Sequence, residues 1–214
     1  MSDALILPRA VLFDMDGTLT EPMLDFPLIK QEMGIGTRPI LEALSELTGQ
    51  RRAEAEAVLH CHEDRAAEHS SLNPGCNELL AWLDQHGIGS AVITRNRRKS
   101  ATTVMKKHRL AIEVLVTRED GPFKPDPRPL LTAIGRLAHK HPGLKPYETW
   151  MVGDGQYDIE SAAAAGVPSV WIAHGRQREF AAQPWRQVND LRELLALLQS
   201  CTAASTNPAA RGGS

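Results

Sequence analysis

The stretch VLFDMDGTL at residues 11–19 decides how the rest of the chain is interpreted. A short apolar run at residues 10–13 predicts a buried strand, which stops at Asp14 and Asp16. Because two neighbouring carboxylates repel each other and no lysine or arginine lies within the stretch, a cation is expected beside them. Mg2+ suits one or two carboxylates combined with phosphate and water, and Gly17 would let backbone amides approach an anion closely. A turn that merely closes a hairpin is the alternative interpretation of this stretch alone.

The composition is typical of a soluble globular protein and argues against several classes of partner. Of 214 residues, 42% are hydrophobic and 23% are charged, which suits one large domain or one domain with a smaller insertion. The net charge of -2 and the lack of a basic tract argue against nucleic acid and anionic membranes as partners. Three scattered cysteines, no signal peptide and no membrane-length apolar run indicate a reducing, cytoplasmic setting. We expect a monomer or a homodimer.

The chain changes its pattern twice, which predicts an insertion within a larger domain. After a first strand at residues 5–14, the following segment predicts only helices, at residues 26–33, 39–47 and 51–69. From residue 73 onward strands and helices alternate, with strands expected at residues 89–93, 114–117, 149–153 and 169–173. Helices are expected between and after them, at residues 77–86, 97–108, 127–139, 159–165 and 191–198.

This alternation predicts an α/β fold in which a parallel sheet has helices on both faces, a three-layer, Rossmann-like core. Residues 1–20 and 73–200 would form the core, and residues 21–72 a small all-helical unit inserted after the first strand. Residues 201–214 are rich in small residues, proline and glycine, and predict a disordered tail.

Polar side chains follow the strands at the edge where ligands bind in open parallel sheets. Besides the two aspartates of the first strand, the sequence places three further groups at this edge: Thr94, Arg95 and Asn96; Lys124 within a Phe-Lys-Pro-Asp-Pro loop; and Asp154 and Asp158 within Gly-Asp-Gly-Gln-Tyr-Asp. In this order, the four motifs resemble those of the haloacid dehalogenase-like superfamily of aspartate-nucleophile phosphohydrolases, over nearly the whole chain from about residue 11 to 198. The resemblance is to the phosphoglycolate phosphatase and beta-phosphoglucomutase branch, and it implies that the inserted helices form a cap over the site.

The chemistry of a phosphate monoester explains why these residue types are needed. The ester is a dianion that repels nucleophiles, so a catalyst must neutralise it and align the attacking oxygen. Asp14 can be the nucleophile that forms an aspartyl-phosphate, and Asp16 can protonate the leaving group and then deprotonate water. Mg2+ would bridge Asp14, Asp154 and a phosphate oxygen. In the resembled family the backbone carbonyl at the position of Asp16 also binds the metal.

The remaining motif residues are expected to hold the phosphoryl group. Gly17, Thr94, Arg95 and Asn96 lie where they can contact phosphate oxygens, and Lys124 supplies a fixed positive charge that shields the nucleophile. Asp158 is expected behind the metal, where it would orient metal-bound water or Lys124.

The helical insertion offers candidates for recognising the leaving group, each of which is also explained as part of a solvated helix face. These candidates are Glu21, Lys30, Arg38, Arg51 and Arg52. The neighbouring residues His60, Cys61, His62 and His69 are not expected to bind a metal, because adjacent helical residues point about a hundred degrees apart. The insertion is short for the family, which suggests a more open site.

The sequence therefore predicts a Mg2+-dependent phosphatase that hydrolyses a small phosphorylated metabolite, similar to phosphoglycolate or a sugar phosphate. A phosphomutase that returns the phosphoryl group to sugar has the same core motifs and remains the alternative. A non-catalytic binding role is a third possibility, and the intact set of acidic and basic motif residues argues against it.

Overall fold

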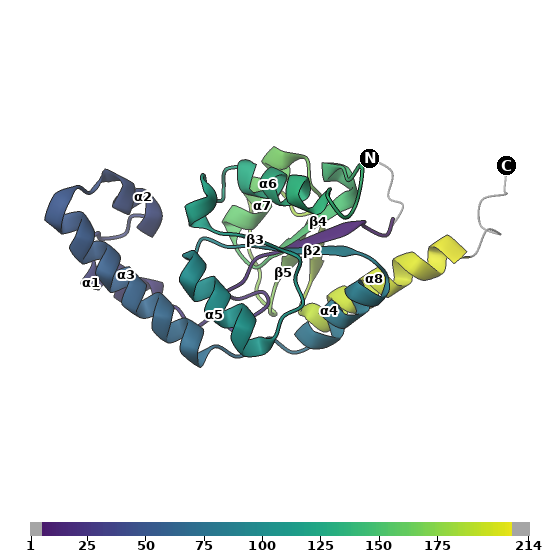
Figure 1. Cartoon of the computed structure of the whole chain (residues 1–214), viewed down its shortest axis with the longest axis horizontal. Helices are drawn as coiled ribbons and strands as arrows, with labels where there is room; N and C mark the ends of the chain where they lie inside the picture. The colour runs from purple at the N-terminus through teal and green to yellow at the C-terminus, as the bar shows by residue number, and fades with distance from the viewer. Residues whose placement is uncertain (1–5, 207–214) are drawn as a thin grey trace.

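The computed structural model describes residues 6–206, with side chains as far as Thr202, and shows an α/β core from which three helices project to one side (Figure 1). The core contains one six-stranded sheet in which every neighbouring pair of strands is parallel. Its strand order is β3-β2-β1-β4-β5-β6. The strands are β1 (Ala10–Phe13), β2 (Gly89–Ile93), β3 (Val114–Val116), β4 (Thr149–Gly153), β5 (Ser169–Ile172) and β6 (Arg186–Val188). The predicted parallel α/β sheet is confirmed.

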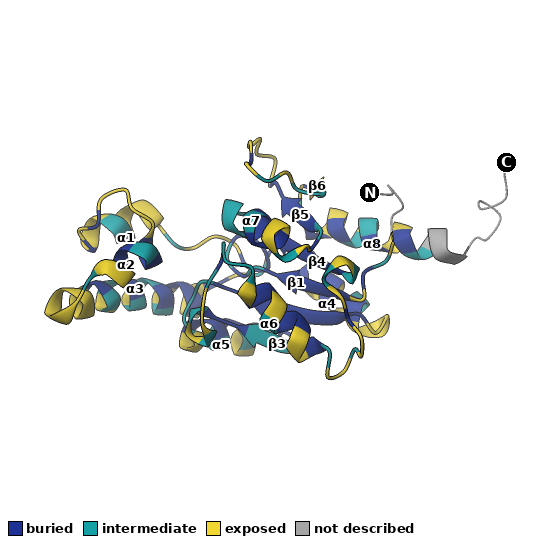
Figure 2. Cartoon of the chain, turned by 90° about the horizontal axis from the view of Figure 1, so that it is seen from above, coloured by how far each residue is buried: buried dark blue, intermediate teal, exposed yellow. Residues whose placement is uncertain are grey.

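Alternate residues of the central strand β1 serve two separate hydrophobic layers. Val11 and Phe13 belong to a layer with α4 (Cys76–Gln85), α5 (Arg98–His108) and α8 (Leu191–Thr206). Ala10 and Leu12 belong to a second layer with α6 (Arg128–Leu137) and α7 (Gln156–Ala165). Because side chains alternate along a strand, this division places helices on both faces of the sheet, as Figure 1 shows. The four inner strands β1, β2, β4 and β5 are buried throughout (Figure 2), which explains why they appear in the sequence as short, mostly apolar runs.

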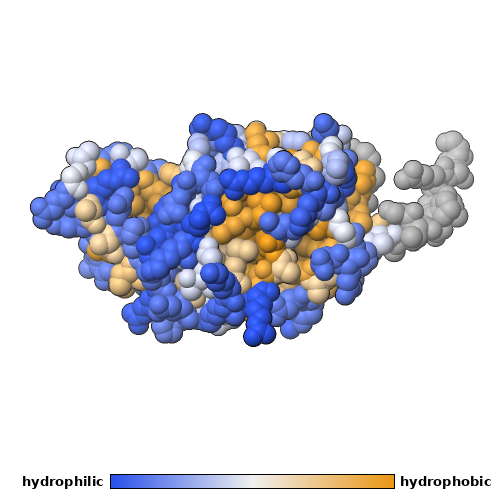
Figure 3. All heavy atoms as spheres, viewed as in Figure 1, coloured by the Kyte–Doolittle hydropathy of each residue, from blue (hydrophilic) through white to orange (hydrophobic). Residues whose placement is uncertain are grey.

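The surface seen in Figure 3 is hydrophilic over α5 and mixed over the projecting helices, and the largest group of apolar atoms lies in its middle. At the edge of the first hydrophobic layer, Met105, Ile112 and Leu115 are only partly buried. None of the described helices combines the length and the apolar character needed to cross a membrane.

The inserted helices have a hydrophobic core of their own. They are α1 (Phe26–Glu32), α2 (Ile40–Glu46) and α3 (Gly49–His69), and we call them the helical unit. Their inward side chains, which include Ile29, Leu41 and Leu59, pack together as a separate buried cluster. Asp25 starts α1 by accepting a hydrogen bond from the backbone N–H of Leu28 at 3.0 Å.

The helical unit leaves and rejoins the core at one place. The backbone N–H of Glu21 donates to the carbonyl of Ser71 at 2.9 Å, and Thr20 pairs with Leu72 in an isolated antiparallel bridge. The insertion therefore interrupts the loop after β1 without displacing the strand.

Several sequence predictions require correction. The first strand, expected at residues 5–14, spans only Ala10–Phe13. The short strand β6 was not predicted, because Arg-Gln-Val lacks an apolar run and forms a strand only by pairing with β5. Helix α7 begins at Gln156, three residues before the expected start, since polar residues occupy its first turn. Helix α8 continues to Thr206 and buries Cys201, so the predicted tail does not begin at residue 201; residues 207–214 lie outside the described part of the chain.

Candidate active site

The ends of the central strands bring distant parts of the chain to one place. From β1 the sheet continues through β2 to β3 on one side and through β4 and β5 to β6 on the other, so the strand order reverses at β1. In open parallel sheets, such a reversal opens a crevice at the carboxyl ends of the strands. Asp14 follows β1, Thr94 follows β2 and Asp154 follows β4, and Lys124 reaches the same place from the loop before α6. The structure thus places the four predicted motifs at the same edge of the sheet.

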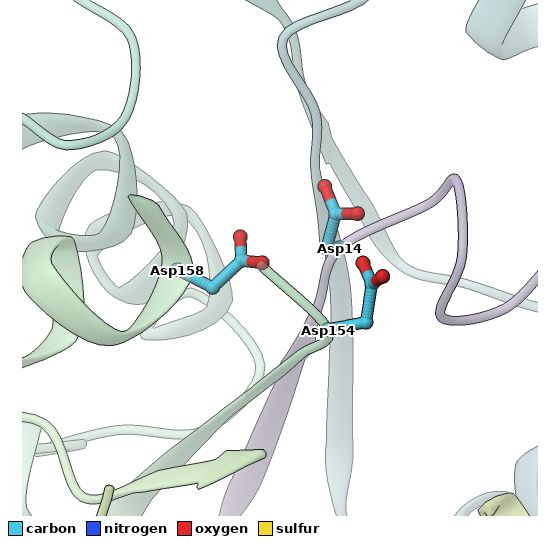
Figure 4. A group of neighbouring side chains, drawn as sticks. All are labelled: Asp14, Asp154 and Asp158. Atoms are coloured by element: carbon cyan, nitrogen blue, oxygen red, sulfur yellow. The ribbon is translucent and has the colours of Figure 1, made fainter. Parts of the chain in front are cut away.

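Three carboxylates form a cluster there. Single oxygen atoms of Asp14, Asp154 and Asp158 lie within 4.8 Å of one another (Figure 4). Asp14 and Asp154 extend from neighbouring strands, while Asp158 reaches toward them from the first turn of α7. Burial raises the pKa of both Asp14 and Asp154, and the charges of the neighbouring aspartates raise it further. A hard divalent cation fits this set of oxygen donors, because its charge would relieve the repulsion among them.

Lys124 is 2% exposed and lies between two of these acids. Its Nζ donates to Oδ1 of Asp14 and to Oδ1 of Asp158, at 2.6 Å in each case. Burial alone would lower the pKa of Lys124, but the charges of Asp14 and Asp158 raise it above its ordinary value, so the ammonium stays charged. The other oxygen of Asp158 accepts from the backbone N–H of Gly155 at 3.0 Å. Since both of its oxygens are occupied, Asp158 is better suited to orienting Lys124 than to binding an ion.

The carboxylate of Asp16 is not part of the acidic cluster and binds Asn96 instead. Its Oδ2 accepts a hydrogen bond from the Asn96 side-chain amide at 2.6 Å, and the Asn96 backbone N–H donates to Oγ1 of Thr94 at 3.0 Å. Burial raises the pKa of Asp16 to about 6, although the bond from Asn96 acts in the opposite direction. A carboxyl group with a pKa near the working pH can both give and take a proton, which suits a general acid and base. Any contribution of Asp16 to metal binding would come from its backbone carbonyl, not from this carboxylate.

Gly17 is required where it stands for two reasons. Its φ of +82° lies in the left-handed region, and a Cβ at this position would come within 2.7 Å of the Asp154 carboxylate. The Gly17 carbonyl oxygen lies 2.6 Å from Nε2 of His174, a residue with φ of +50° directly beyond β5.

Two residues of the site were missed by the sequence analysis. His174 contacts the Gly17 loop, and the Arg176 guanidinium donates to Oδ2 of Asp154 at 3.0 Å. Both follow the strand β5, so the rule that identified the other loops would also have pointed to this one. The sequence prediction had considered only the loops that follow the earlier strands.

Arg95 does not lie as expected for a phosphate ligand. Its guanidinium binds both carboxylate oxygens of Glu42 in α2, at 3.0 and 2.8 Å, and also donates to the backbone carbonyl of Lys124. The rings of Phe123 and Tyr157 lie 4.8 and 4.4 Å from the guanidinium carbon. The charge of Arg95 is therefore directed to the helical unit, because adjacency to Thr94 in the chain does not fix the direction of a long side chain.

Three of the five polar candidates of the insertion have partners within the insertion. Lys30 donates to the carbonyl of Thr37 at 3.3 Å, Arg38 binds Glu46 at 2.8 Å, and Arg52 binds Glu56 at 2.8 Å. The other two, Glu21 and Arg51, are exposed. The contacts of Lys30, Arg38 and Arg52 do not bring these residues to the acidic cluster.

The histidines of α3 bind other groups. His62 lies 2.7 Å from a carboxylate oxygen of Glu32, and Nδ1 of His69 lies 2.9 Å from the carbonyl of Arg65. Cys61 is exposed.

Comparison with known proteins identifies the family. The sequence pattern of the haloacid dehalogenase-like hydrolases matches residues 28–172, and the chain belongs to this family. An uncharacterized hydrolase of Saccharomyces cerevisiae is 29% identical over 209 residues, which cover 92% of this chain and 94% of that protein. A phosphoglycolate phosphatase of Pseudomonas putida is 29% identical, with 94% of this chain and 82% of that protein covered. The crystal structure of a hydrolase from Pseudomonas syringae has the same fold, with a TM-score of 0.73 at 22% identity, and covers 89% of this chain and 98% of that one.

Proposed function

We propose that the protein is a Mg2+-dependent phosphatase that hydrolyses a small phosphorylated metabolite, of the phosphoglycolate or sugar-phosphate type, through an aspartyl-phosphate on Asp14. The observation that supports this most directly is the position of the Asp14 carboxylate, which lies beside Asp154 and accepts a hydrogen bond from Lys124. The family is one of hydrolases, and the relative in Pseudomonas putida is named a phosphoglycolate phosphatase.

The residues divide the reaction into two displacements. A free oxygen of Asp14 attacks phosphorus, the bond to the ester oxygen breaks, and Asp16 transfers its proton to that departing oxygen. Asp16, now ionised, accepts a proton from water, which attacks phosphorus and releases inorganic phosphate and free Asp14. Lys124 holds positive charge beside the nucleophile throughout, and Thr94, the residue after β2, would donate to a phosphoryl oxygen.

Asp14, Asp154 and the backbone carbonyl of Asp16 would hold Mg2+. The ion would supply charge neutralisation between the carboxylate and the phosphoryl oxygens.

The proposal predicts that Asp14→Asn abolishes turnover, because an amide oxygen is too weak a nucleophile. Hydrolysis of p-nitrophenyl phosphate should require Mg2+ in the unchanged protein and should fall by at least about a thousandfold in the variant. Asp84→Asn, on the exposed side of α4, is the control and should retain full activity. Hydrolysis that persists in a chelator, or in Asp14→Asn, contradicts this mechanism.

Product analysis separates hydrolysis from a mutase reaction. With a hexose 1-phosphate and Mg2+, a phosphatase releases inorganic phosphate, whereas a mutase forms an isomeric hexose phosphate. Formation of the isomer without free phosphate contradicts the proposed hydrolysis.

A further inference from the structure

The contact between Arg95 and Glu42 joins the helical unit to the catalytic loops. Arg95 is the residue after Thr94, and its guanidinium donates to the backbone carbonyl of Lys124, whose own side chain binds Asp14. The ring centroids of Phe123 and Tyr157 lie 4.8 and 4.4 Å from its guanidinium carbon, and one terminal nitrogen of the guanidinium binds both oxygens of Glu42. The side chain of Arg95 is 20% exposed and that of Glu42 is 37% exposed, so the pair lies at the boundary between the site and solvent.

The other arginines at this boundary are paired in the same way. Arg97 binds Asp64 of α3 at 2.5 Å, and Arg118 binds Glu63 of α3 through both carboxylate oxygens. All three arginines come from the loops after β2 and β3, and all three acids come from the helical unit. The core therefore presents arginines whose charge is already compensated before any substrate enters.

A cavity of about 440 Å³ lies between α2, α3 and the loop after β3, close to these pairs. Leu41, Leu44 and Phe123 give it an apolar side, and Ser45 and His60 add polar groups. Four charged side chains complete the lining: Arg52, Glu56, Arg118 and Glu119. Arg52 is paired with Glu56 and Arg118 with Glu63, so both arginines at the cavity already have an acidic partner. Burial and the nearby Arg97 lower the pKa of His60, which favours the neutral imidazole. The volume is that of a small-molecule pocket.

We infer that Glu42 is a specificity-determining residue: by occupying the guanidinium of Arg95, it directs the enzyme against phosphate esters that carry a second anionic group and toward esters whose leaving group is uncharged. This inference rests on the proposed phosphatase function and narrows its substrate class to esters without a second anionic group, such as polyol and sugar phosphates. A carboxylate on the leaving group finds the guanidinium of Arg95 already paired with Glu42, so this cation is not free to bind it.

The test uses two esters that differ in one group, 2-hydroxyethyl phosphate and 2-phosphoglycolate. The unchanged protein should have the higher kcat/KM for the uncharged ester. Glu42→Gln removes the carboxylate charge and frees Arg95, which should shift the ratio of the two kcat/KM values by at least about tenfold toward 2-phosphoglycolate.

Two further variants separate this effect from a general disturbance of α2. Glu46→Gln neutralises an exposed acid of the same helix that binds Arg38, and it should leave the ratio unchanged. The double variant Glu42→Gln/Arg95→Gln should lose the gain for 2-phosphoglycolate, because the freed guanidinium is gone. A preference of the unchanged protein for 2-phosphoglycolate overturns the inference, and so does an equal effect of Glu42→Gln on both esters.

A binding measurement keeps the inference independent of turnover. Calorimetry with phosphonoacetate and 2-hydroxyethylphosphonate compares the same two end groups on compounds that are not hydrolysed. If neither ester is hydrolysed but Glu42→Gln tightens phosphonoacetate binding alone, the phosphatase proposal fails and the role of Glu42 is supported. If both esters are hydrolysed and neither the kcat/KM ratio nor the ratio of dissociation constants shifts, the role of Glu42 is overturned while the phosphatase proposal stands.

Discussion

The carboxyl group of Asp16 illustrates how the site balances function against stability. A group that must carry a proton near neutral pH needs a raised pKa, and burial supplies it. The same burial makes the ionised form unfavourable in the folded protein, so the folded chain holds this proton more tightly than the unfolded chain does.

The pH dependence of stability follows from this difference. The pKa of Asp16 is about 6 in the folded protein, against 3.8 for an ordinary aspartate, so stability is lost as the pH rises from about 4 to above 6. Asp16→Asn removes this loss. In metal-free buffer at pH 8, the free energy of unfolding of the variant should exceed that of the unchanged protein by up to about 3 kcal/mol. Urea unfolding at pH 8 and pH 4 measures the effect, which should disappear at the lower pH. If Asp16→Asn is more stable than the unchanged protein by the same amount at both pH values, the titration of Asp16 is not the cause.

Gly17 provides a second prediction at this scale. Gly17→Ala places a Cβ against the Asp154 carboxylate and strains the backbone at φ of +82°, so activity should fall at least about tenfold with a stability loss of about 1–2 kcal/mol. Gly34→Ala is the matched control, because Gly34 also has a positive φ but no atom lies within 4 Å of its would-be Cβ. Gly34→Ala should lose similar stability in urea and keep its activity toward p-nitrophenyl phosphate. Equal loss of activity in both variants contradicts the proposed clash.

The sequence predicts the location of those site residues that directly follow a strand or belong to a motif. Asp14, Lys124 and Asp154 follow directly from strand ends and motif spacing, and the structure brings them together. The contact of Arg95 with Glu42 could not be predicted, because it depends on how a helix distant in sequence packs beside the loop.

Helix α3 connects the helical unit to the core through a buried acid. Glu63 is 3% exposed, and its carboxylate is bound by Arg118, with Arg97 at 3.6 Å. The sequence predicts a helix over residues 51–69, but it gives no reason to expect a glutamate on the buried face of this helix. The acid is buried because two arginines from separate loops meet it, a contact that only the tertiary structure reveals.

Removing this charge should weaken the attachment of the helical unit. Glu63→Gln leaves the partly buried Arg118 without its carboxylate partner and leaves Arg97 with Asp64 alone, so it should lower the free energy of unfolding by about 3 kcal/mol. Glu56→Gln is the control, since Glu56 lies on the same helix and binds the exposed Arg52. Urea denaturation followed by circular dichroism compares the two variants. A loss in Glu63→Gln no larger than that in the control shows that the buried pair is not stabilising.

At the scale of the whole molecule, the site depends on segments spread over the full length of the core. Its residues run from Asp14 to Arg176, so the acidic cluster forms only when the sheet is complete. A ligand that binds this cluster therefore binds the folded chain and not the unfolded one, and it must stabilise the fold.

This predicts that Mg2+ raises the melting temperature of the protein. At a concentration one hundred times its dissociation constant, the ion should add about 2.7 kcal/mol to the free energy of unfolding. Asp154→Asn should lose most of this increase while remaining folded, because one of the acids that repel each other becomes neutral. Differential scanning calorimetry with Mg2+ and with a chelator makes the comparison. An unchanged melting temperature on adding Mg2+ to the unchanged protein argues against a metal site.

The position at which the helical unit joins the core has a consequence for evolution. The residues that flank it are hydrogen-bonded to each other in the loop after β1, so the segment between them starts and finishes at one point of the core. A segment of another length could therefore replace it without shifting the sheet, which would change the surroundings of the substrate and leave the acidic cluster in place.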